Sequence, residues 1–158
     1  QYFDHEENKS YTPYVVETSI GLDRMFLAIF SNSLVEEELD NNTTRTVLKL
    51  PAVLAPTKAA ILPLVKKDGL PEVARQIMKD LSWDFNVFYD EKDAVGKRYR
   101  RQDAAGTPFC ITVDHETLEN NTVTIRHRDT MKQERVQISE LKEMIAQAVD
   151  AKTWLMKM

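Results

Sequence analysis

The chain has 158 residues, of which 42% are hydrophobic and 29% are charged, as expected for one globular domain with a core of its own. Its net charge of −4 argues against a protein that binds nucleic acid through overall positive charge, and no apolar run approaches the roughly 18 residues of a membrane-spanning helix. The single cysteine, Cys110, excludes an internal disulfide, and three scattered histidines without ligand spacing predict no metal site.

The first part of the chain predicts a loop, a strand and a helix. Residues 1–12 are polar and acidic, which predicts a loop and gives no signal-peptide pattern. Tyr14–Val16 predict a short buried strand, and Gly21 predicts the turn that ends it. The apolar residues from Met25 to Phe30 then predict a helix that is buried on nearly all of its sides.

A charged, turn-rich segment follows this helix. Glu36–Thr44 read E-E-E-L-D-N-N-T-T, which predicts a linker and places a domain boundary near residue 45. The first 50 residues hold nine acidic and four basic residues, whereas the rest of the chain has a slight excess of positive charge. The chain begins with Gln, so it is either a mature N-terminus or a piece of a longer protein.

Strands and helices alternate in the rest of the chain. Ala59–Val65 form a short continuous apolar run, which is typical of a strand buried on both faces, although Pro63 is unusual there. Four further strands are predicted over 85–89, 108–113, 122–126 and 134–138, and the last two form a hairpin. Helices are predicted over Leu70–Ser82, over Val95–Ala105 before Gly106, and over 141–148 with Ser139 as N-cap. The predicted class is α/β, with a mixed five-stranded sheet flanked by helices.

Two basic clusters lie in this second part. The first, K-R-Y-R-R at 97–101, either binds phosphates while Tyr99 stacks on an unpaired base, or forms a solvated helix face with Tyr99 turned inward. The second cluster contains Arg126 and Arg128 at the end of a strand. Ligands gather at strand ends and helix N-termini of α/β sheets, so two clusters that converge favour nucleic-acid binding.

Two other groups of reactive residue types favour structural roles. Cys110 lies between Phe109 and Ile111 with no basic residue placed to lower the pKa of its thiol, so it predicts a buried structural cysteine. Asp114-His115-Glu116 resembles a catalytic cluster, but it falls in a polar segment between strands, which favours a solvated turn.

Charged and polar residues also interrupt the apolar segment near the N-terminus. Glu17 and Ser19 are two residues apart, so on a strand their side chains share a face and could hold an amino group. Arg24 could stack its guanidinium on an aromatic base. Alternatively, Glu17 and Arg24 form an ion pair that joins strand to helix, and the residue types alone leave both readings open.

Four segments carry a resemblance to a known family: V-V-E-T-S-I-G-L-D-R at 15–24, L-A-P-T-K-A-A-I-L-P-L-V-K-K at 54–67, G-K-R-Y-R-R-Q-D-A-A-G-T-P-F-C-I-T-V-D at 96–114, and N-T-V-T-I-R-H-R-D-T at 121–130. In this order, over roughly 13–145, they resemble the glycyl-tRNA synthetases of the dimeric bacterial and eukaryotic type. The first segment resembles the third motif of class II aminoacyl-tRNA synthetases. The others resemble the anticodon-binding domain shared by the glycine, histidine, threonine and proline enzymes.

The resemblance implies roles for individual residues. Glu17 and Ser19 would bind the amino group of glycine, in a pocket lined by Thr18, Ile20 and Gly21. Arg24 would pack on the adenine of ATP and hold its phosphates, in a nucleotide site shaped by Gly21, Leu22 and Asp23. The residues implied at the face that binds the anticodon of glycine tRNA are Lys97, Arg98, Tyr99, Arg100, Arg101, Arg126 and Arg128.

The resemblance also implies a division of the chain. Residues 1–45 would be the end of a catalytic domain with a linker, and 46–158 the anticodon-binding domain. The first two motifs of the class are missing, so we expect a C-terminal fragment that binds tRNA without catalysing and needs no cofactor. The complete enzyme would be a cytoplasmic homodimer that joins glycine to its tRNA using ATP and magnesium, with no membrane or DNA partner. The alternative is an accessory module with the same fold, which contacts another protein and charges no tRNA.

Overall fold

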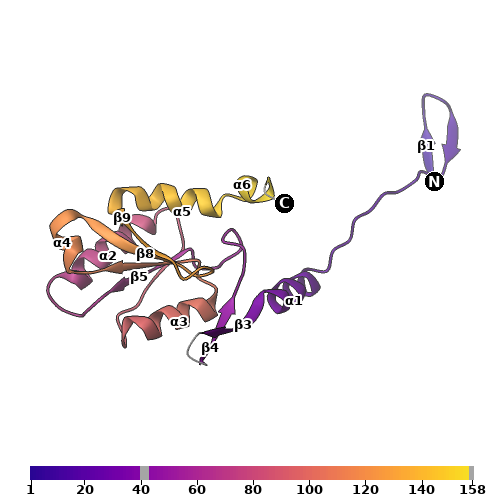
Figure 1. The fold of residues 1–158 in the computed structure, drawn as a ribbon. Coiled ribbons are helices and arrows are strands. Elements are labelled where there is room, and N and C mark those ends of the chain that lie inside the picture. Colours follow the sequence, from indigo (N-terminus) through magenta and orange to yellow (C-terminus); the bar gives the residue numbers. More distant parts are fainter. Residues whose placement is uncertain (40–42, 157–158) are drawn as a thin grey trace.

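The computed structural model describes residues 1–39 and 43–156, and its centre is a mixed five-stranded sheet (Figure 1). The strands lie in the order β6-β5-β7-β8-β9, where β5 spans Ala59–Pro63, β6 Val87–Tyr89, β7 Phe109–Val113, β8 Thr122–His127 and β9 Gln133–Gln137. β6 and β7 both pair with β5 in parallel, and β8 and β9 continue the sheet in antiparallel pairing. The predicted α/β class and five-stranded sheet are confirmed.

Helices cover the two faces of this sheet with different chemistry. α2 (Leu70–Leu81) and α5 (Leu141–Val149) pack on one face, and α3 (Val95–Ala105) packs on the other (Figure 1). The residues of α2 that enter the core recur every three or four positions, as an amphipathic helix requires. The main core on the α2 and α5 face contains Ala59, Leu70, Ala74, Ile77, Leu81, Ile61, Ile111, Val113, Val123, Ile125, Leu141 and Ile145.

The core on the α3 face is much smaller. Ala60, Leu62 and Cys110 are buried there, and Tyr99 of α3 packs against them. Burial raises the pKa of the Cys110 thiol to about 12, so it is protonated at neutral pH. The predicted structural role of this cysteine agrees with its burial. The rest of this face carries polar residues, which are described with the candidate site.

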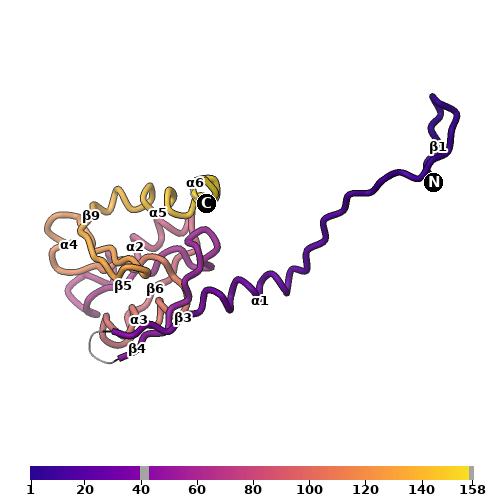
Figure 2. The backbone as a smooth tube through the Cα atoms, turned by 45° about the vertical axis from the view of Figure 1, so that its right-hand side comes forward, coloured from indigo at the N-terminus to yellow at the C-terminus, as the bar shows by residue number. Residues whose placement is uncertain are grey.

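The N-terminal segment leads away from the body of the molecule in both views (Figures 1 and 2). Where a loop was predicted, β1 (Tyr2–Asp4) and β2 (Lys9–Tyr11) form a small antiparallel hairpin. The buried strand predicted over Tyr14–Val16 is wrong, because these residues have no strand partner and Tyr14 and Val16 are 103% and 98% exposed. The apolar sequence predicted burial, but the described residues contain nothing that covers it.

α1 (Leu22–Ser33) follows, and it is a helix as predicted but not a buried one. Leu22, Phe26 and Leu27 are exposed on it. Part of the other side of α1 borders two open grooves, which Ile29 shares with Leu54 of the following loop. Because the apolar side chains of α1 lie on several sides of the helix, a single neighbour on one side cannot bury them all.

The linker predicted over Glu36–Thr44 is wrong where the structure describes it. β3 (Leu34–Leu39) and β4 (Thr43–Leu48) form an antiparallel hairpin, while residues 40–42 of the predicted linker lie outside the described residues. The charges misled the prediction because alternate residues of β3 are half-buried, so its Glu side chains do not all face solvent. β4 packs against α3, which fastens this hairpin to the five-stranded sheet.

Three short helical segments differ from the sequence-based expectation. α4 (His115–Asn120) replaces the turn predicted at 114–116, and Asp114 starts it with a capping box in which its side chain accepts from the Thr117 amide. The N-cap predicted at Ser139 is wrong, because this residue lies inside a 3₁₀ turn, η1 (Ile138–Glu140), that leads into α5. α6 (Ala151–Leu155) follows α5 and was not predicted.

Gly106 ends α3 in the left-handed conformation, with φ of 80°, as the sequence predicted for this stop. A Cβ atom added at Gly106 would lie 3.1 Å from the Leu48 carbonyl oxygen of β4, so the close approach of the hairpin also requires glycine. Gly96, inside the same helix, has negative φ and open space around an added Cβ.

We therefore expect Gly106→Ala to lower the free energy of unfolding by roughly 1–3 kcal/mol, from the left-handed conformation and the contact with Leu48. Gly96→Ala is the matched control, and it should stabilise the helix by about 0.5–1 kcal/mol because alanine has the higher helix propensity. Urea unfolding followed by circular dichroism measures both variants. Equal stability of the two variants would contradict this account of Gly106.

Candidate nucleic-acid interface

A row of polar side chains crosses the α3 face of the sheet. Thr112 of β7 lies opposite Thr124 of β8, which lies opposite Arg135 of β9. Thr112 is two residues from Cys110, so the row shares the face that α3 covers only in part. The side chain of Arg135 is 27% exposed, and Thr124 is half-buried. We name Thr112, Thr124 and Arg135 the polar row.

Arg135 is held in place by a fork of hydrogen bonds. Its guanidinium donates to both carboxylate oxygens of Asp114, at 2.6 and 2.8 Å, and to the hydroxyls of Thr122 and Thr124, at 2.7 and 3.2 Å. Glu116 of α4 lies 3.5 Å away on the solvent side. The bond from Arg135 holds the pKa of the Asp114 carboxyl below its usual value. Cation, carboxylates and hydroxyls thus meet where β7 ends and β8 begins, beside the middle of β9.

Arg98, predicted to contact tRNA, is a structural residue. Its side chain is buried at 1% exposure, and its guanidinium donates to the carbonyl oxygens of Pro63, Asp90 and Leu64 at 2.6, 3.1 and 3.2 Å. These carbonyls follow β5 and β6, so Arg98 clamps the carboxyl ends of two neighbouring strands. The Arg98 guanidinium is thus engaged inside the protein, and its contact with tRNA stays a prediction.

Arg126 and Arg128 are also buried, at 6% and 3% exposure, and their contact with tRNA likewise stays a prediction. Arg126 donates to both oxygens of Asp103 in α3, at 2.8 and 3.0 Å. Arg128 donates to the carbonyl oxygens of Gly106 and Leu50 at 2.8 and 2.7 Å. These two arginines therefore link β8 and the residue after it to α3 and to the segment that follows β4.

Tyr99 does not offer a free ring face for stacking. The guanidinium carbon of Arg126 lies 4.9 Å from its ring centroid, and the ring also packs against the small core that contains Cys110. The Tyr99 and Thr112 hydroxyls are 2.6 Å apart, which joins the tyrosine to the polar row. Tyr99 is thus turned inward, the alternative that the sequence left open.

Three of the predicted basic residues are exposed on α3: Lys97, Arg100 and Arg101. Arg101 forms ion pairs with Asp90 and Asp93, at 2.7 and 2.8 Å. Among the residues that the structure describes, Lys97 and Arg100 have no ion-pair partner. Arg100 precedes the inward-facing Asp103 by three positions, so the two residues share one side of α3.

The residues predicted to bind glycine and ATP lie apart from this surface, in the N-terminal segment and the start of α1 (Figure 2). Glu17, Thr18, Ser19 and Ile20 are exposed in extended chain, and Gly21 is the N-cap of α1 with φ of −76°. Leu22, Asp23 and Arg24 are exposed in the first turn of that helix. No Glu17–Arg24 ion pair forms within the described part of the chain, and the roles of all eight residues stay predictions.

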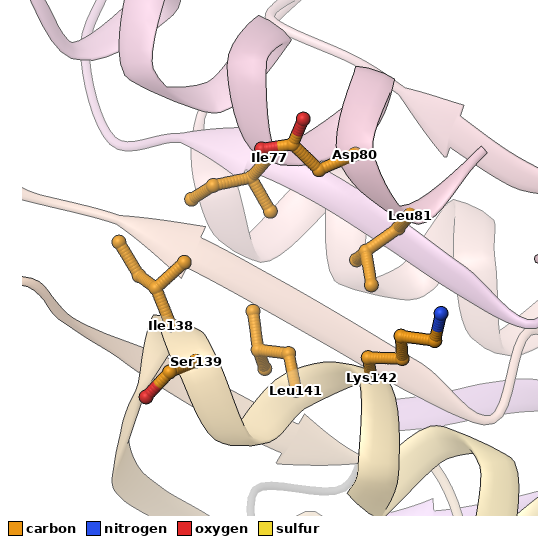
Figure 3. Close-up of a pocket in the computed structure, with 7 residues that line it drawn as sticks. All are labelled: Ile77, Asp80, Leu81, Ile138, Ser139, Leu141 and Lys142. Atoms are coloured by element: carbon orange, nitrogen blue, oxygen red, sulfur yellow. The ribbon is translucent and has the colours of Figure 1, made fainter. Parts of the chain in front are cut away.

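A groove on the opposite side of the molecule does not join the site. It lies between α2 and the η1–α5 segment, has a volume of about 240 Å³, and is lined mainly by Ile77, Leu81, Ile138 and Leu141 (Figure 3). Lys142 at its rim is paired with Asp84 at 2.8 Å. Over residues 1–39 and 43–156, no three His, Cys, Asp or Glu side chains are grouped to hold a metal ion.

Comparison with known proteins assigns the fold described above. Residues 58–148, which include the five-stranded sheet, α2, α3 and most of α5, match the family described as "Anticodon binding domain". The chain belongs to the anticodon binding domain family. This match spans more than half of the chain and includes the polar row, Lys97 and Arg100.

Several relatives share most of the chain outside this family match as well. The chain is 52% identical over 141 residues to a glycine–tRNA ligase of Borrelia hermsii, and 53% identical over 146 residues to one of Chlorobaculum tepidum. These matches cover 89% and 92% of this chain but only 32% and 31% of the relatives. The chain therefore spans about a third of the length of these relatives.

A solved structure supports the fold alone. The RNA binding domain of threonyl-tRNA synthetase from Cryptosporidium parvum superposes with a TM-score of 0.58 at 23% sequence identity, over 63% of this chain and 25% of that one. This arrangement of sheet and helices thus also occurs in a protein with little sequence identity to this chain.

The polar row of the anticodon binding domain was missed at the sequence level. Its residues belong to strands that were predicted correctly, and strict alternation would have placed Thr112, Thr124 and Arg135 on one face once the pairing was known. The pairing register is the information that a single sequence did not supply. The basic run at 97–101 predicted the interface instead, although Arg98 and Tyr99 of this run point inward.

Asp114→Asn tests the polar cluster of the anticodon binding domain, because asparagine keeps the helix-capping oxygen and removes the charge. We expect a loss of about 1 kcal/mol at pH 7 from the bidentate pair with Arg135. The lowered pKa of Asp114 means that this stability is present above pH ~3.9 and is lost as the pH falls through the folded-state pKa. Unfolding of both proteins between pH 7 and pH 2 measures the difference, and a constant difference would refute the ion pair.

Proposed function

We propose that this chain is the tRNA-binding part of a glycine–tRNA ligase, and that it binds the anticodon of glycine tRNA on the α3 face of its sheet. The single observation that carries the proposal is that this face carries the polar row, of which Thr124 and Arg135 are partly exposed, within a fold that belongs to the anticodon binding domain family. The glycine–tRNA ligases that are about half identical to the chain supply the identity of the tRNA.

The chemistry of this face supports recognition of RNA. β7 is buried along its length, Thr112 included, whereas Thr124 of β8 and Arg135 of β9 are partly exposed, so the outer part of this face leaves room for a ligand. Unpaired bases of RNA loops expose donors and acceptors along their edges. Thr124 offers a hydroxyl and Glu116 offers an exposed carboxylate, while Arg135, whose N–H groups donate to Asp114, Thr122 and Thr124, holds these groups in place. These groups form a surface that can distinguish bases by hydrogen bonding.

Phosphate binding would come from the flank of α3. Lys97 and Arg100 are exposed and carry no ion pair within the described residues, so binding a phosphate would not require them to leave a partner. Arg101 would first have to leave Asp90 and Asp93. We therefore assign Lys97 and Arg100 as the principal phosphate contacts, and Arg101 as a lesser one.

The N-terminal region fits a piece of a catalytic domain. We propose that Glu17 and Ser19 bind glycine beside Thr18, Ile20 and Gly21, and that Arg24 binds ATP beside Leu22 and Asp23, when the rest of the longer protein surrounds them. The exposed apolar side chains of α1 support this, because they suit a helix that other segments of a longer protein cover. ATP with magnesium, homodimer formation and a cytoplasmic location belong to this proposal for the longer protein.

The proposed division of the chain follows the hairpin. A boundary near residue 45 falls inside β4, whose Arg45 is paired to Asp103 of α3 at 3.0 Å. We propose that the catalytic part ends with α1 and that the hairpin β3–β4 belongs to the unit that binds tRNA.

Binding to glycine tRNA tests the main proposal. The chain should bind this tRNA more tightly than a transcript with an altered anticodon, and both affinities should fall as salt rises because phosphate contacts release counterions. Lys97→Ala and Arg100→Ala should each weaken binding to both transcripts and reduce the slope of log affinity against log salt by about 1. Lys79→Ala is the control, since Lys79 is an exposed cation of α2 on the opposite face. Equal binding of the two transcripts would refute anticodon recognition.

A second experiment tests the assignment of catalysis to the longer protein. The chain alone should show no glycine-dependent exchange of pyrophosphate into ATP, because the described residues around Glu17, Ser19 and Arg24 form an extended segment and not a pocket. A longer relative with the same segment serves as the positive control. Exchange by this chain alone would contradict the proposal.

A further inference from the structure

A buried carboxylate joins the hairpin to the face that carries the polar row. Asp103 of α3 accepts from Arg45 of β4 at 3.0 Å and from Arg126 of β8 at 2.8 and 3.0 Å. All three side chains are buried, and Arg45 also pairs with Glu37 of β3. Two guanidinium groups therefore share one carboxylate, so the position of either one depends on the other.

Contacts continue from this cluster to the polar row. Arg126 lies over the Tyr99 ring, and the Tyr99 hydroxyl hydrogen-bonds the Thr112 hydroxyl. Thr112 is the first member of the row, opposite Thr124. Arg45 thus stands at one end of a short series of direct contacts and the polar row at the other.

Arg45 does more than fasten the hairpin, because other contacts already do so. Gly106 approaches the Leu48 carbonyl closely, and the Arg128 guanidinium donates to the Leu50 carbonyl at 2.7 Å. Lys49 pairs with Glu37, as Arg45 does, but remains partly exposed on the hairpin. Unlike Lys49, Arg45 enters the protein, where it pairs with Asp103 and donates to the Arg128 carbonyl oxygen.

We propose that Arg45 is a positioning residue for the nucleic-acid face: through Asp103 and Arg126 it fixes Tyr99 and so the hydroxyl of Thr112 in the polar row. This inference rests on the proposed function, because it assigns to the hairpin a part in anticodon discrimination. Arg45 lies outside the segment 58–148 that matches the anticodon binding domain family, so the hairpin extends the recognition unit beyond that match.

Arg45→Met and Lys49→Met form a matched pair, since each removes one cation that pairs with Glu37 and only the first removes the contact with Asp103. Two quantities are measured on the full chain. One is the ratio of affinities for glycine tRNA and for a transcript with an altered anticodon. The other is the NMR shift of the Thr112 methyl group, which needs no tRNA.

In Arg45→Met, we expect the Thr112 shift to change and the affinity ratio to fall by about tenfold, the effect of losing one hydrogen bond to a charged group. Both quantities should stay at the native values in Lys49→Met. A folded Arg45→Met protein with either the native shift or the native ratio would overturn the proposal, as would an equal effect of Lys49→Met.

Arg45→Lys covers the case in which Arg45→Met does not fold. Lysine keeps the buried charge but cannot donate to Glu37, Asp103 and the Arg128 carbonyl in the fixed fork of arginine, so an intermediate shift and ratio are expected. Native values in this variant would overturn the proposal. If the native chain itself fails to distinguish the two transcripts, the proposed function fails, and the Thr112 shift still decides whether Arg45 acts on the polar row.

Discussion

The structure depends on one constraint, which is that the two faces of its five-stranded sheet have different chemistry. Strand alternation sends Ile61, Ile111 and Ile125 to the face covered by α2 and α5, where they form the main core. The same alternation sends Thr112 and Thr124 to the other face. Stability is therefore concentrated on one side of the sheet. The other side is left to α3, the hairpin and the surface that we propose for tRNA.

Buried arginines compensate for the small core on that second face. Arg98 binds carbonyls at the ends of β5 and β6, Arg126 binds Asp103, and Arg128 binds carbonyls of Gly106 and Leu50. Planar guanidinium groups suit this role because each directs several N–H donors to fixed acceptors. Removing an acceptor would leave an unpaired buried charge, which is costly. The desolvation of a buried charge offsets much of the gain from its contacts, so these contacts mainly fix the geometry of the α3 face. On the α3 side, the basic residues thus divide into buried arginines that join parts of the fold and exposed cations such as Lys97 and Arg100.

Much of the fold was predictable from the sequence, and the reasons for the failures are physical. The strand at 59–63 was predictable from its continuous apolar run, the helix at 70–81 from its apolar periodicity, and the end of α3 from Gly106. The strands of the β3–β4 hairpin were missed because a run of glutamates predicts a solvent-exposed loop. Charge density could not reveal that Arg98 and Arg126 point inward, since the acceptors that satisfy them are distant in sequence. For the same reason, the polar row emerged only with the strand register.

Burial of Cys110 protects its thiol from alkylating reagents. Alkylating reagents attack the thiolate, and a thiol with a pKa of about 12 inside the small core of the α3 face offers almost none at neutral pH. We therefore expect the folded chain not to react with maleimides. A cysteine introduced on the exposed flank of α3 would carry a dye or spin label without any need to remove the natural one. Slow labelling of Cys110 itself would then report transient opening of the domain.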